Sequence, residues 1–246
     1  MTDPILLTAA RVLTFDGQRP LTNASGFFFE RDRQLFLVTS RHVLWDEPSK
    51  HYPDRIEIEL HVDSKNMAKS TGFSMPLYQH GKSMWRQGCD QAGDIDIALI
   101  RIDRGALPAE IAYRAFTPQH LAGSKPVEVG TSLLVVGFPL GFHDTLHHMP
   151  VVRQAIVASS FTFRFQGQGY FLTDARTHSG TSGAPVIMRA PVGSAGLGEL
   201  PWILLGVHSA RLDIGGRDSG SDEALGLNCA WYADILLTLT ESQADD

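Results

Sequence analysis

The amino-acid sequence predicts an all-β protein with two β-barrels or β-sandwiches of roughly a hundred residues each. Short apolar segments, several of them alternating, recur between Gly, Pro, Asp and Asn at intervals that suit antiparallel sheets. A turn-rich stretch between Asp103 and Pro126 separates two such regions near the middle of the chain. With 246 residues, of which 43% are hydrophobic, the chain is long enough to give each half a core.

The expected elements divide between an N-terminal domain, residues 1–115, and a C-terminal domain, residues 116–246. One helix is expected, over residues 230–241, because Trp231, Ile235 and Leu239 recur four residues apart and would share one face. We expect this helix to cap the second domain. The expected strands are residues 25–30, 35–39, 56–61, 95–102, 132–137, 151–158, 170–173, 186–188 and 202–209.

Composition excludes several classes of protein. The formal net charge is -6 and no run of Lys or Arg occurs, so a nucleic-acid partner is not expected. The start of the chain carries Asp3 where a secretory signal would be basic, and its apolar run breaks at Arg11, so neither a signal peptide nor a membrane span is expected. The chain has two cysteines, Cys89 and Cys229, which disfavours a disulfide-stapled secreted domain but leaves a single pairing open. A cytoplasmic setting fits best.

Polar residues interrupt three apolar segments in a way that points to a chemical site. His42 follows the strand LFLVTS, where an imidazole can be held firmly with one face open. Asp94 and Asp96 lead into an apolar strand, where a carboxylate is costly to bury unless an N–H group donates to it. Ser182 lies between Gly180 and Gly183, and glycines let backbone N–H groups turn freely. Acyl transfer by serine requires a base, an acid that orients it, and such N–H groups.

In this order, the segments VTSRHVL, DIALI and SGTSGAPV resemble the motifs of the chymotrypsin-like (trypsin-like) serine peptidases. The resemblance implies two six-stranded antiparallel β-barrels with the active site in the cleft between them. It implies a serine endopeptidase that acts on protein or peptide substrates without a cofactor or metal. Ser182 would be the nucleophile, His42 the general base and Asp96 its orienting acid, with the N–H groups of Gly180 and Ser182 as the oxyanion hole. Asp94 is a rival for the acid; Asp96 is preferred because it directly precedes IALI, as in the family motif.

The sequence departs from the digestive members of that family just before the nucleophile. Those enzymes carry an aspartate there that pairs with a newly cut N-terminus, whereas this chain has Thr181. Activation by such a salt bridge is therefore not expected. The sequence is instead similar to the bacterial branch of glutamyl endopeptidases and HtrA/Deg-type proteases, through the segments SRHVL, VVGFPLG and LGLNCAWYADIL. No PDZ-like domain is expected after the cap helix. An unidentified regulatory partner remains open.

The same resemblance suggests which residues contact substrate. Thr177 and His208 resemble the pair that glutamyl endopeptidases and viral 3C-like proteases use to bind a P1 carboxylate or amide. We expect cleavage after Glu or Gln, and Glu is placed ahead because Arg176 would add positive charge if it points inward. The alternative is a small, apolar P1 residue, which applies if Arg176 points to solvent and His208 serves only in packing. The backbone at 209–211, starting from Ser209, is expected to pair with extended substrate.

Other residue groups in the sequence suggest alternative functions. A zinc site could form in a helical loop from His143, Asp144, His147 and His148. Gly141 and Pro150 leave room for only one helical turn, so a surface loop beside the cleft is expected and no metal site is predicted. A catalytically silent or conditionally activated protease-fold peptide-binding protein is the main alternative function. An esterase of the α/β-hydrolase type is disfavoured because GTSGAPV runs into a strand.

Overall fold

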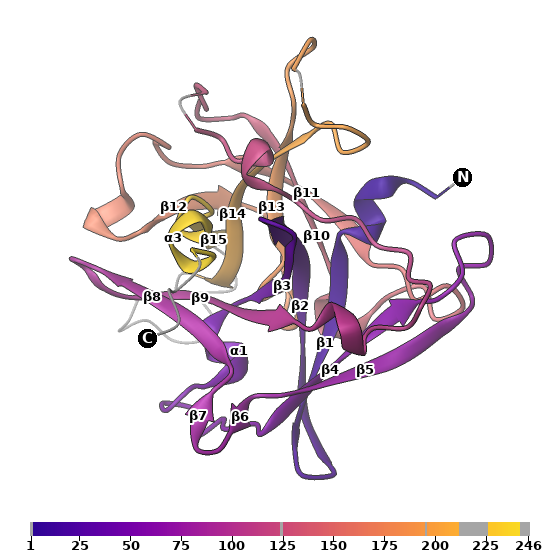
Figure 1. Cartoon of the computed structure of the whole chain (residues 1–246). Coiled ribbons are helices and arrows are strands. Elements are labelled where there is room, and N and C mark those ends of the chain that lie inside the picture. The colour runs from indigo at the N-terminus through magenta and orange to yellow at the C-terminus, as the bar shows by residue number, and fades with distance from the viewer. Residues whose placement is uncertain (1, 124, 195, 212–225, 242–246) are drawn as a thin grey trace.

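The computed structural model describes residues 2–123, 125–194, 196–211 and 226–241, so the rest of the expected C-terminal domain lies outside the described residues. The first half forms a seven-stranded antiparallel sheet in the order β5-β4-β1-β2-β3-β9-β8 (Figure 1). A two-residue pair, β6 (Tyr78–Gln79) with β7 (Lys82–Ser83), stands beside it. The seven strands are β1 (Ala9–Asp16), β2 (Arg19–Arg31), β3 (Gln34–Thr39), β4 (Arg55–His61), β5 (Ser70–Pro76), β8 (Trp85–Asp90) and β9 (Gly93–Ile102).

The second half is a closed barrel of six antiparallel strands in the order β10-β11-β12-β15-β14-β13. The all-β fold class is therefore confirmed, although the resemblance implied six strands in the first half and the structure has a sheet of seven with the β6–β7 pair beside it. The barrel strands are β10 (Ser132–Gly137), β11 (Val151–Val157), β12 (Tyr170–Asp174), β13 (Pro185–Arg189), β14 (Trp202–Arg211) and β15 (Leu227–Tyr232).

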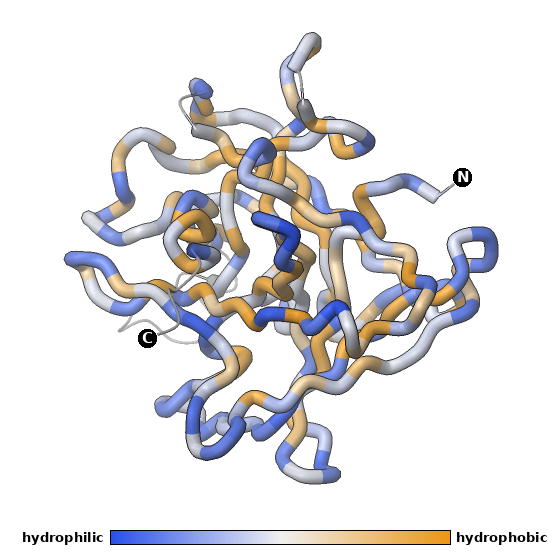
Figure 2. Tube along the Cα trace, viewed as in Figure 1, coloured by the Kyte–Doolittle hydropathy of each residue, from blue (hydrophilic) through white to orange (hydrophobic). Residues whose placement is uncertain are grey.

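Three apolar clusters explain how the two halves pack. Successive residues of a strand point to opposite faces, so a strand that is buried on both faces contributes to two cores. On β2, Phe27 and Phe29 lie in the cluster between the halves, whereas Phe28 lies in the core of the first sheet. A third cluster fills the six-stranded barrel and includes Phe171 and Ala230. Figure 2 shows hydrophobic residues along these inner strands and hydrophilic ones in the outer turns.

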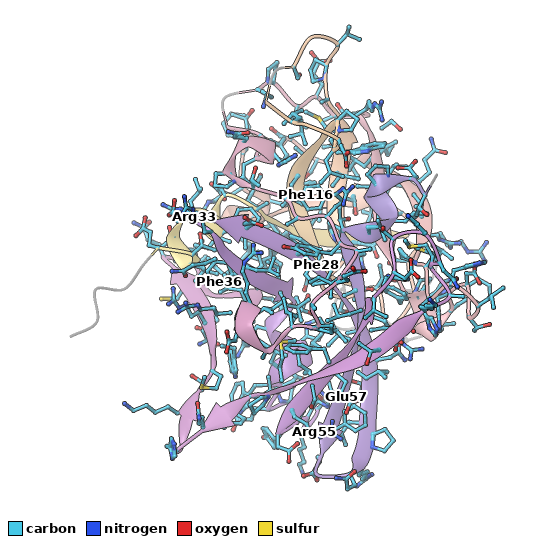
Figure 3. All side chains as sticks on the ribbon, turned by 45° about the vertical axis from the view of Figure 1, so that its right-hand side comes forward. Phe28, Arg33, Phe36, Arg55, Glu57 and Phe116 are labelled. Atoms are coloured by element: carbon cyan, nitrogen blue, oxygen red, sulfur yellow. The ribbon has the colours of Figure 1, made fainter. Side chains whose placement is uncertain are left out.

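The connection from 103 to 131 crosses from one half to the other. Phe116 bridges to Phe29 of the first sheet and packs edge-on against Phe27, whereas Leu121 bridges to Leu204 of the barrel. Figure 3 shows Phe116 in the interior near Phe28, while Arg55 and Glu57, which form an ion pair, lie at the outer end of the first sheet. The expected boundary between residues 115 and 116 falls in this connection and stays a prediction.

The expected helix over residues 230–241 is wrong in its first part. Trp231 lies on β15, where it pairs with Tyr170 of β12 and Val207 of β14, and the helix α3 covers only Ile235–Leu239. Strand pairing on two sides therefore overrides the spacing of four that suggested a helix. Ile235 and Leu239 pack beside Gly88 of β8, so α3 docks against the first sheet and links the two halves.

Short helices occupy other turns: α1 (Arg41–Leu44) follows β3, and the described residues include five 3₁₀ helices in loops. No helix among the described residues is long and apolar enough to cross a bilayer. Cys89 is exposed and Cys229 is buried, and both are free thiols. The 3₁₀ helices are η1 (Pro4–Leu7), η2 (Arg104–Ala106), η3 (Pro118–His120), η4 (Pro139–Gly141) and η5 (Phe165–Gly167).

Candidate active site

His42 and Asp96 are held together by two hydrogen bonds. His42 lies in the single-turn helix α1, and Asp96 lies on β9, the strand that pairs with β3 directly before that helix. The Nδ1 of His42 is 2.7 Å from Oδ2 of Asp96, and the backbone N–H of His42 donates to Oδ1 at 2.9 Å. One carboxylate thus fixes both the ring and the backbone of His42, which leaves Nε2 as the ring nitrogen on the other side.

Asp94 lies elsewhere. Its side chain is 57% exposed, against 17% for Asp96, and its carboxylate is 3.8 Å from a guanidinium nitrogen of Arg41. An ion pair of this exposure contributes little to stability, because solvent screens it. Of the two carboxylates that precede the apolar strand, the structure brings only Asp96 to His42.

The charges of the pair shift both pKa values toward the ionised forms. Burial alone would lower the pKa of His42, but the hydrogen bond and the negative charge of Asp96 outweigh burial and raise it above its ordinary value. Burial alone would likewise raise the pKa of Asp96, but the hydrogen bond and charge of His42 and the hydroxyl of Ser209 lower it. The site therefore favours an ionised Asp96 and stabilises a protonated imidazole.

Ser182 and Asp96 are linked through Ser209 of β14. The Ser182 hydroxyl donates to the backbone carbonyl of Ser209 at 2.9 Å, and the Ser209 hydroxyl donates to Oδ2 of Asp96. Hydrogen bonds between described residues do not include one from Ser182 to His42. Ser182 is partly exposed, in a turn between the buried residues Thr181 and Gly183.

Glycines shape the turn that carries Ser182. Gly180 and Gly183 have φ values of +88° and +86°, in the left-handed region that favours glycine. The carbonyl of Ser179 accepts a hydrogen bond of 2.6 Å from the N–H of Leu140, which fixes the peptide group joining Ser179 to Gly180. Within the described part of the chain, the N–H groups of Gly180 and Ser182 donate to no protein acceptor. The turn thus presents two backbone donors beside the Ser182 hydroxyl.

The residues expected to contact substrate separate into buried and exposed ones. Thr177 and His208 are buried, with 5% and 2% exposure, whereas Arg176 is exposed, which removes the reason for placing Glu ahead of Gln. The Thr177 hydroxyl donates to Oδ1 of Asn228 at 2.5 Å. His208 on β14 pairs with Ala230 on the neighbouring strand β15. Asn228 is two residues from Ala230, so the side chains of His208 and Asn228 lie on the same face of the sheet.

Asn228 is a site residue that the sequence analysis missed. Its Nδ2 donates to the carbonyls of Ala175 and Gly226 at 2.7 and 3.0 Å, which fixes the orientation of the amide. The available signal was a buried amide in the otherwise apolar strand LNCAWY, because a buried polar side chain requires partners.

The histidine-rich loop at 143–148 has local partners instead of a common centre. His143 Nδ1 is 2.6 Å from the carbonyl of Gly141, and His147 Nδ1 is 2.8 Å from Oδ2 of Asp144. His143 and His148 stack with ring centroids 6.2 Å apart. Among the residues that the structure describes, no three His, Cys, Asp or Glu side chains form a group able to hold a metal ion.

A cavity of about 720 Å³ lies in the first half, away from these residues. Buried residues of three strands, including Leu35, Met75 and Ile100, line it together with Arg33 and Arg101. None of the residues around Ser182 contributes to its wall. Its position therefore says nothing about the chemistry at His42 and Asp96.

A known protein family matches most of this chain. The model of a family described as "Trypsin-like peptidase domain" matches residues 24–190, which is more than half of the chain and includes His42, Asp96 and Ser182. The chain therefore belongs to the trypsin-like peptidases. A comparison with curated protein sequences found no match.

Among solved structures, the chain is similar to the serine endoprotease from Yersinia pestis, with a TM-score of 0.55 and 16% sequence identity. The match covers 95% of this chain but only 61% of that one. At this identity the likeness concerns the fold, which is that of a bacterial serine endoprotease.

Proposed function

We propose that this chain is a serine endopeptidase that cleaves peptide bonds through an acyl-enzyme on Ser182. The observation that carries the proposal is the double hydrogen bond from His42 to Asp96, joined to Ser182 through Ser209. This arrangement gives a hydroxyl, an imidazole with a fixed tautomer and an ionised carboxylate in one place. The glutamyl endopeptidase and HtrA/Deg-type branch, a peptide substrate and a cytoplasmic setting remain part of the proposal.

The proposed reaction begins when the Ser182 hydroxyl turns from the Ser209 carbonyl toward Nε2 of His42. The Ser182 oxygen attacks the carbonyl carbon of the scissile bond while its proton passes to Nε2, and Asp96 stabilises the imidazolium. His42 then gives this proton to the leaving amine as the C–N bond breaks. Water, deprotonated by the same imidazole, then attacks the acyl carbon. The bond to the Ser182 oxygen breaks, that oxygen takes the proton back from His42, and the acid product leaves.

The peptide group before Gly180 supports a formed oxyanion hole. In a trans peptide the N–H points opposite to the C=O, and the Ser179 carbonyl points to the N–H of Leu140. The Gly180 N–H therefore points away from Leu140, and with the Ser182 N–H it is available to the oxygen that becomes negative in the transition state. Donors that are already oriented need no reorganisation during reaction, which is why they accelerate it.

For P1 we propose an amide, Gln, ahead of Glu. The NH₂ group of Asn228 donates to two carbonyls, so the amide oxygen faces Thr177 and accepts the proton of its hydroxyl. Because this proton is used, the Thr177 oxygen can only accept a hydrogen bond from any further partner. An acceptor suits the NH₂ of Gln and repels a carboxylate. Arg176 is exposed and gives no support to Glu. A small apolar P1 residue is the alternative if His208 serves only in packing.

A second candidate function follows from the resting position of the nucleophile. The Ser182 hydroxyl donates to Ser209, so a protein in which this bond persists would bind peptides without cleaving them until a regulatory partner shifts the hydroxyl. The two candidates differ in turnover. A conditionally activated protein would be silent alone and active with a partner.

Cleavage of a peptide library tests the proposed function. Wild-type protein should generate new termini that are absent with Ser182→Ala, and the residues before the cut should be enriched in Gln and, less strongly, Glu. A folded wild type that generates no termini beyond those of Ser182→Ala would contradict the proposed endopeptidase activity. The peptide-binding function would then be the remaining candidate. Cleavage without enrichment of amide or acidic P1 residues would contradict only the specificity.

A further inference from the structure

Ser25 on β2 is a buried serine whose hydroxyl and backbone N–H both bind the turn around Ser182. It has no exposed surface. Its hydroxyl donates to the carbonyl of Gly180 at 2.7 Å, and its backbone N–H donates to the carbonyl of Ser182 at 2.9 Å. Its own carbonyl accepts from the Thr39 hydroxyl at 2.8 Å. Ser25 therefore connects the first sheet to the turn that carries the nucleophile.

The direction of the Ser25 hydroxyl is determined by its neighbours. The N–H of Phe138 donates to the Ser25 oxygen at 2.9 Å, so the single hydroxyl proton is left for the Gly180 carbonyl. The peptide group after Gly180 is thus held by Ser25, while the peptide group before it is held by Leu140 through Ser179. Both peptide groups that flank Gly180 are anchored, and a glycine has little steric resistance of its own to a peptide flip.

Three glycines provide the space for this contact. A Cβ on Gly137 would lie 2.6 Å from the Ser25 hydroxyl oxygen, and one on Gly183 would lie 2.1 Å from the Ser25 carbonyl oxygen. A Cβ on Gly180 would lie 2.7 Å from both Asn23 Oδ1 and the Phe138 carbonyl. A side chain at Gly180 or Gly183 would require the backbone to move, and one at Gly137 would displace the Ser25 hydroxyl, so the serine and the glycines form one fitted unit.

We propose that Ser25 is a positioning residue for the oxyanion hole: its hydroxyl holds the carbonyl of Gly180 and so keeps the peptide group after Gly180 from rotating. This supports the anchored peptide group before it, which carries the Gly180 N–H. This role rests on the proposed function of Ser182 and Gly180. Ser25 has no exposed surface from which to contact a substrate, and it acts through the turn alone. Its loss should therefore affect the chemical step and leave substrate binding nearly unchanged.

The test compares Ser25→Ala with Thr14→Val. Thr14 is an equally buried hydroxyl that bonds to Thr22 of β2, away from Ser182, and so controls for a lost buried hydrogen bond. Removing an oxyanion donor outright lowers kcat by about 10²–10³-fold, and loosening one should cost about 10–100-fold. For Ser25→Ala we expect kcat per active site to fall in that range with KM within about twofold of wild type. Thr14→Val should retain kcat.

A tetrahedral inhibitor separates positioning from loss of folding. Active sites are first titrated with a fluorophosphonate, so that misfolded protein does not enter kcat. A peptide boronic acid, which forms a tetrahedral adduct with Ser182, should lose affinity in Ser25→Ala by a factor close to the loss in kcat. In contrast, the affinity of a product peptide should not change.

A second variant probes the same contact from the other side. Gly137→Ala would push on the Ser25 hydroxyl, and we expect it also to lower kcat per titrated site. An unchanged kcat and boronate affinity in Ser25→Ala, or an equal loss in Thr14→Val, would overturn the positioning role while the endopeptidase stands. A wild type that neither labels nor turns over would overturn the proposed function, and this role with it.

Discussion

Replacing Asp96 by Asn tests how the carboxylate supports His42. Asp96 accepts three hydrogen bonds, from Nδ1–H and the backbone N–H of His42 and from the Ser209 hydroxyl. An Asn has one acceptor oxygen, and if that oxygen keeps the backbone N–H of His42, its NH₂ group faces Nδ1. The imidazole must then carry its proton on Nε2, where it cannot accept the proton of Ser182. The variant keeps its shape but holds the wrong tautomer.

The magnitude follows from losing the base almost completely. A wrong tautomer lowers kcat by about 10⁴-fold in serine peptidases of this mechanism, which corresponds to about 5.5 kcal/mol of transition-state stabilisation. Asp94→Asn is the matched control, because Asp94 is exposed and bonds only to Arg41 among the described residues. We expect that variant to stay within about twofold of wild type. Initial rates on a fluorogenic peptide, normalised to folded protein, measure both effects.

Two results would refute this reasoning. A kcat of Asp96→Asn above about a tenth of the wild-type value would show that His42 needs no orienting carboxylate. An equal loss in Asp94→Asn would mean that the exposed carboxylate, not the buried one, supports the reaction. Either result would break the link between the observed hydrogen bonds and the proposed roles.

The remaining predictions concern pH, specificity and stability. Because Asp96 raises the pKa of His42 and the base must be neutral, kcat/KM should fall as the pH drops, with a midpoint above about 6.5. A pH profile with a midpoint clearly below that value would contradict the pairing of His42 with Asp96. Thr177→Val should lower kcat/KM about tenfold or more for a peptide with Gln at P1 and leave kcat/KM unchanged for a matched peptide with a small apolar P1 residue. Equal losses for the two peptides would contradict a contact between Thr177 and the P1 side chain. Phe116→Ala, at a fully buried position between the halves, should reduce the free energy of unfolding by about 3–5 kcal/mol in urea titrations, and a loss below about 1 kcal/mol would show that the halves pack without it.

The sequence could predict the parts of this protein that have local signals. His42, Asp96 and Ser182 stand at the ends or turns of apolar strands, and the structure brings His42 to Asp96 and links Ser182 to them through Ser209. The alternation of apolar residues predicted most of the inner strands. The contact between Thr177 and Asn228 had no such signal, because the two residues are far apart in the chain and meet only in the folded barrel.

Edge strands and the C-terminal helix show why the rest could not be predicted. β5 and β8 carry few apolar residues, and each lies at an edge of the first sheet. Trp231 has helical spacing to Ile235 and Leu239, but pairing on both sides of β15 decides its conformation. Ser25 reads as an ordinary strand residue, and only the packing of two halves reveals its contact with Gly180.

The central claim is that His42 activates Ser182 for attack on a carbonyl. Intact-mass measurement after incubation with a fluorophosphonate tests it most directly, with the adduct located by peptide mapping. One adduct per folded chain should form at neutral pH, lie on Ser182, and form far more slowly in His42→Ala. A wild type that stays unmodified while folded, or an adduct that lies elsewhere or forms as fast without His42, would contradict the claim.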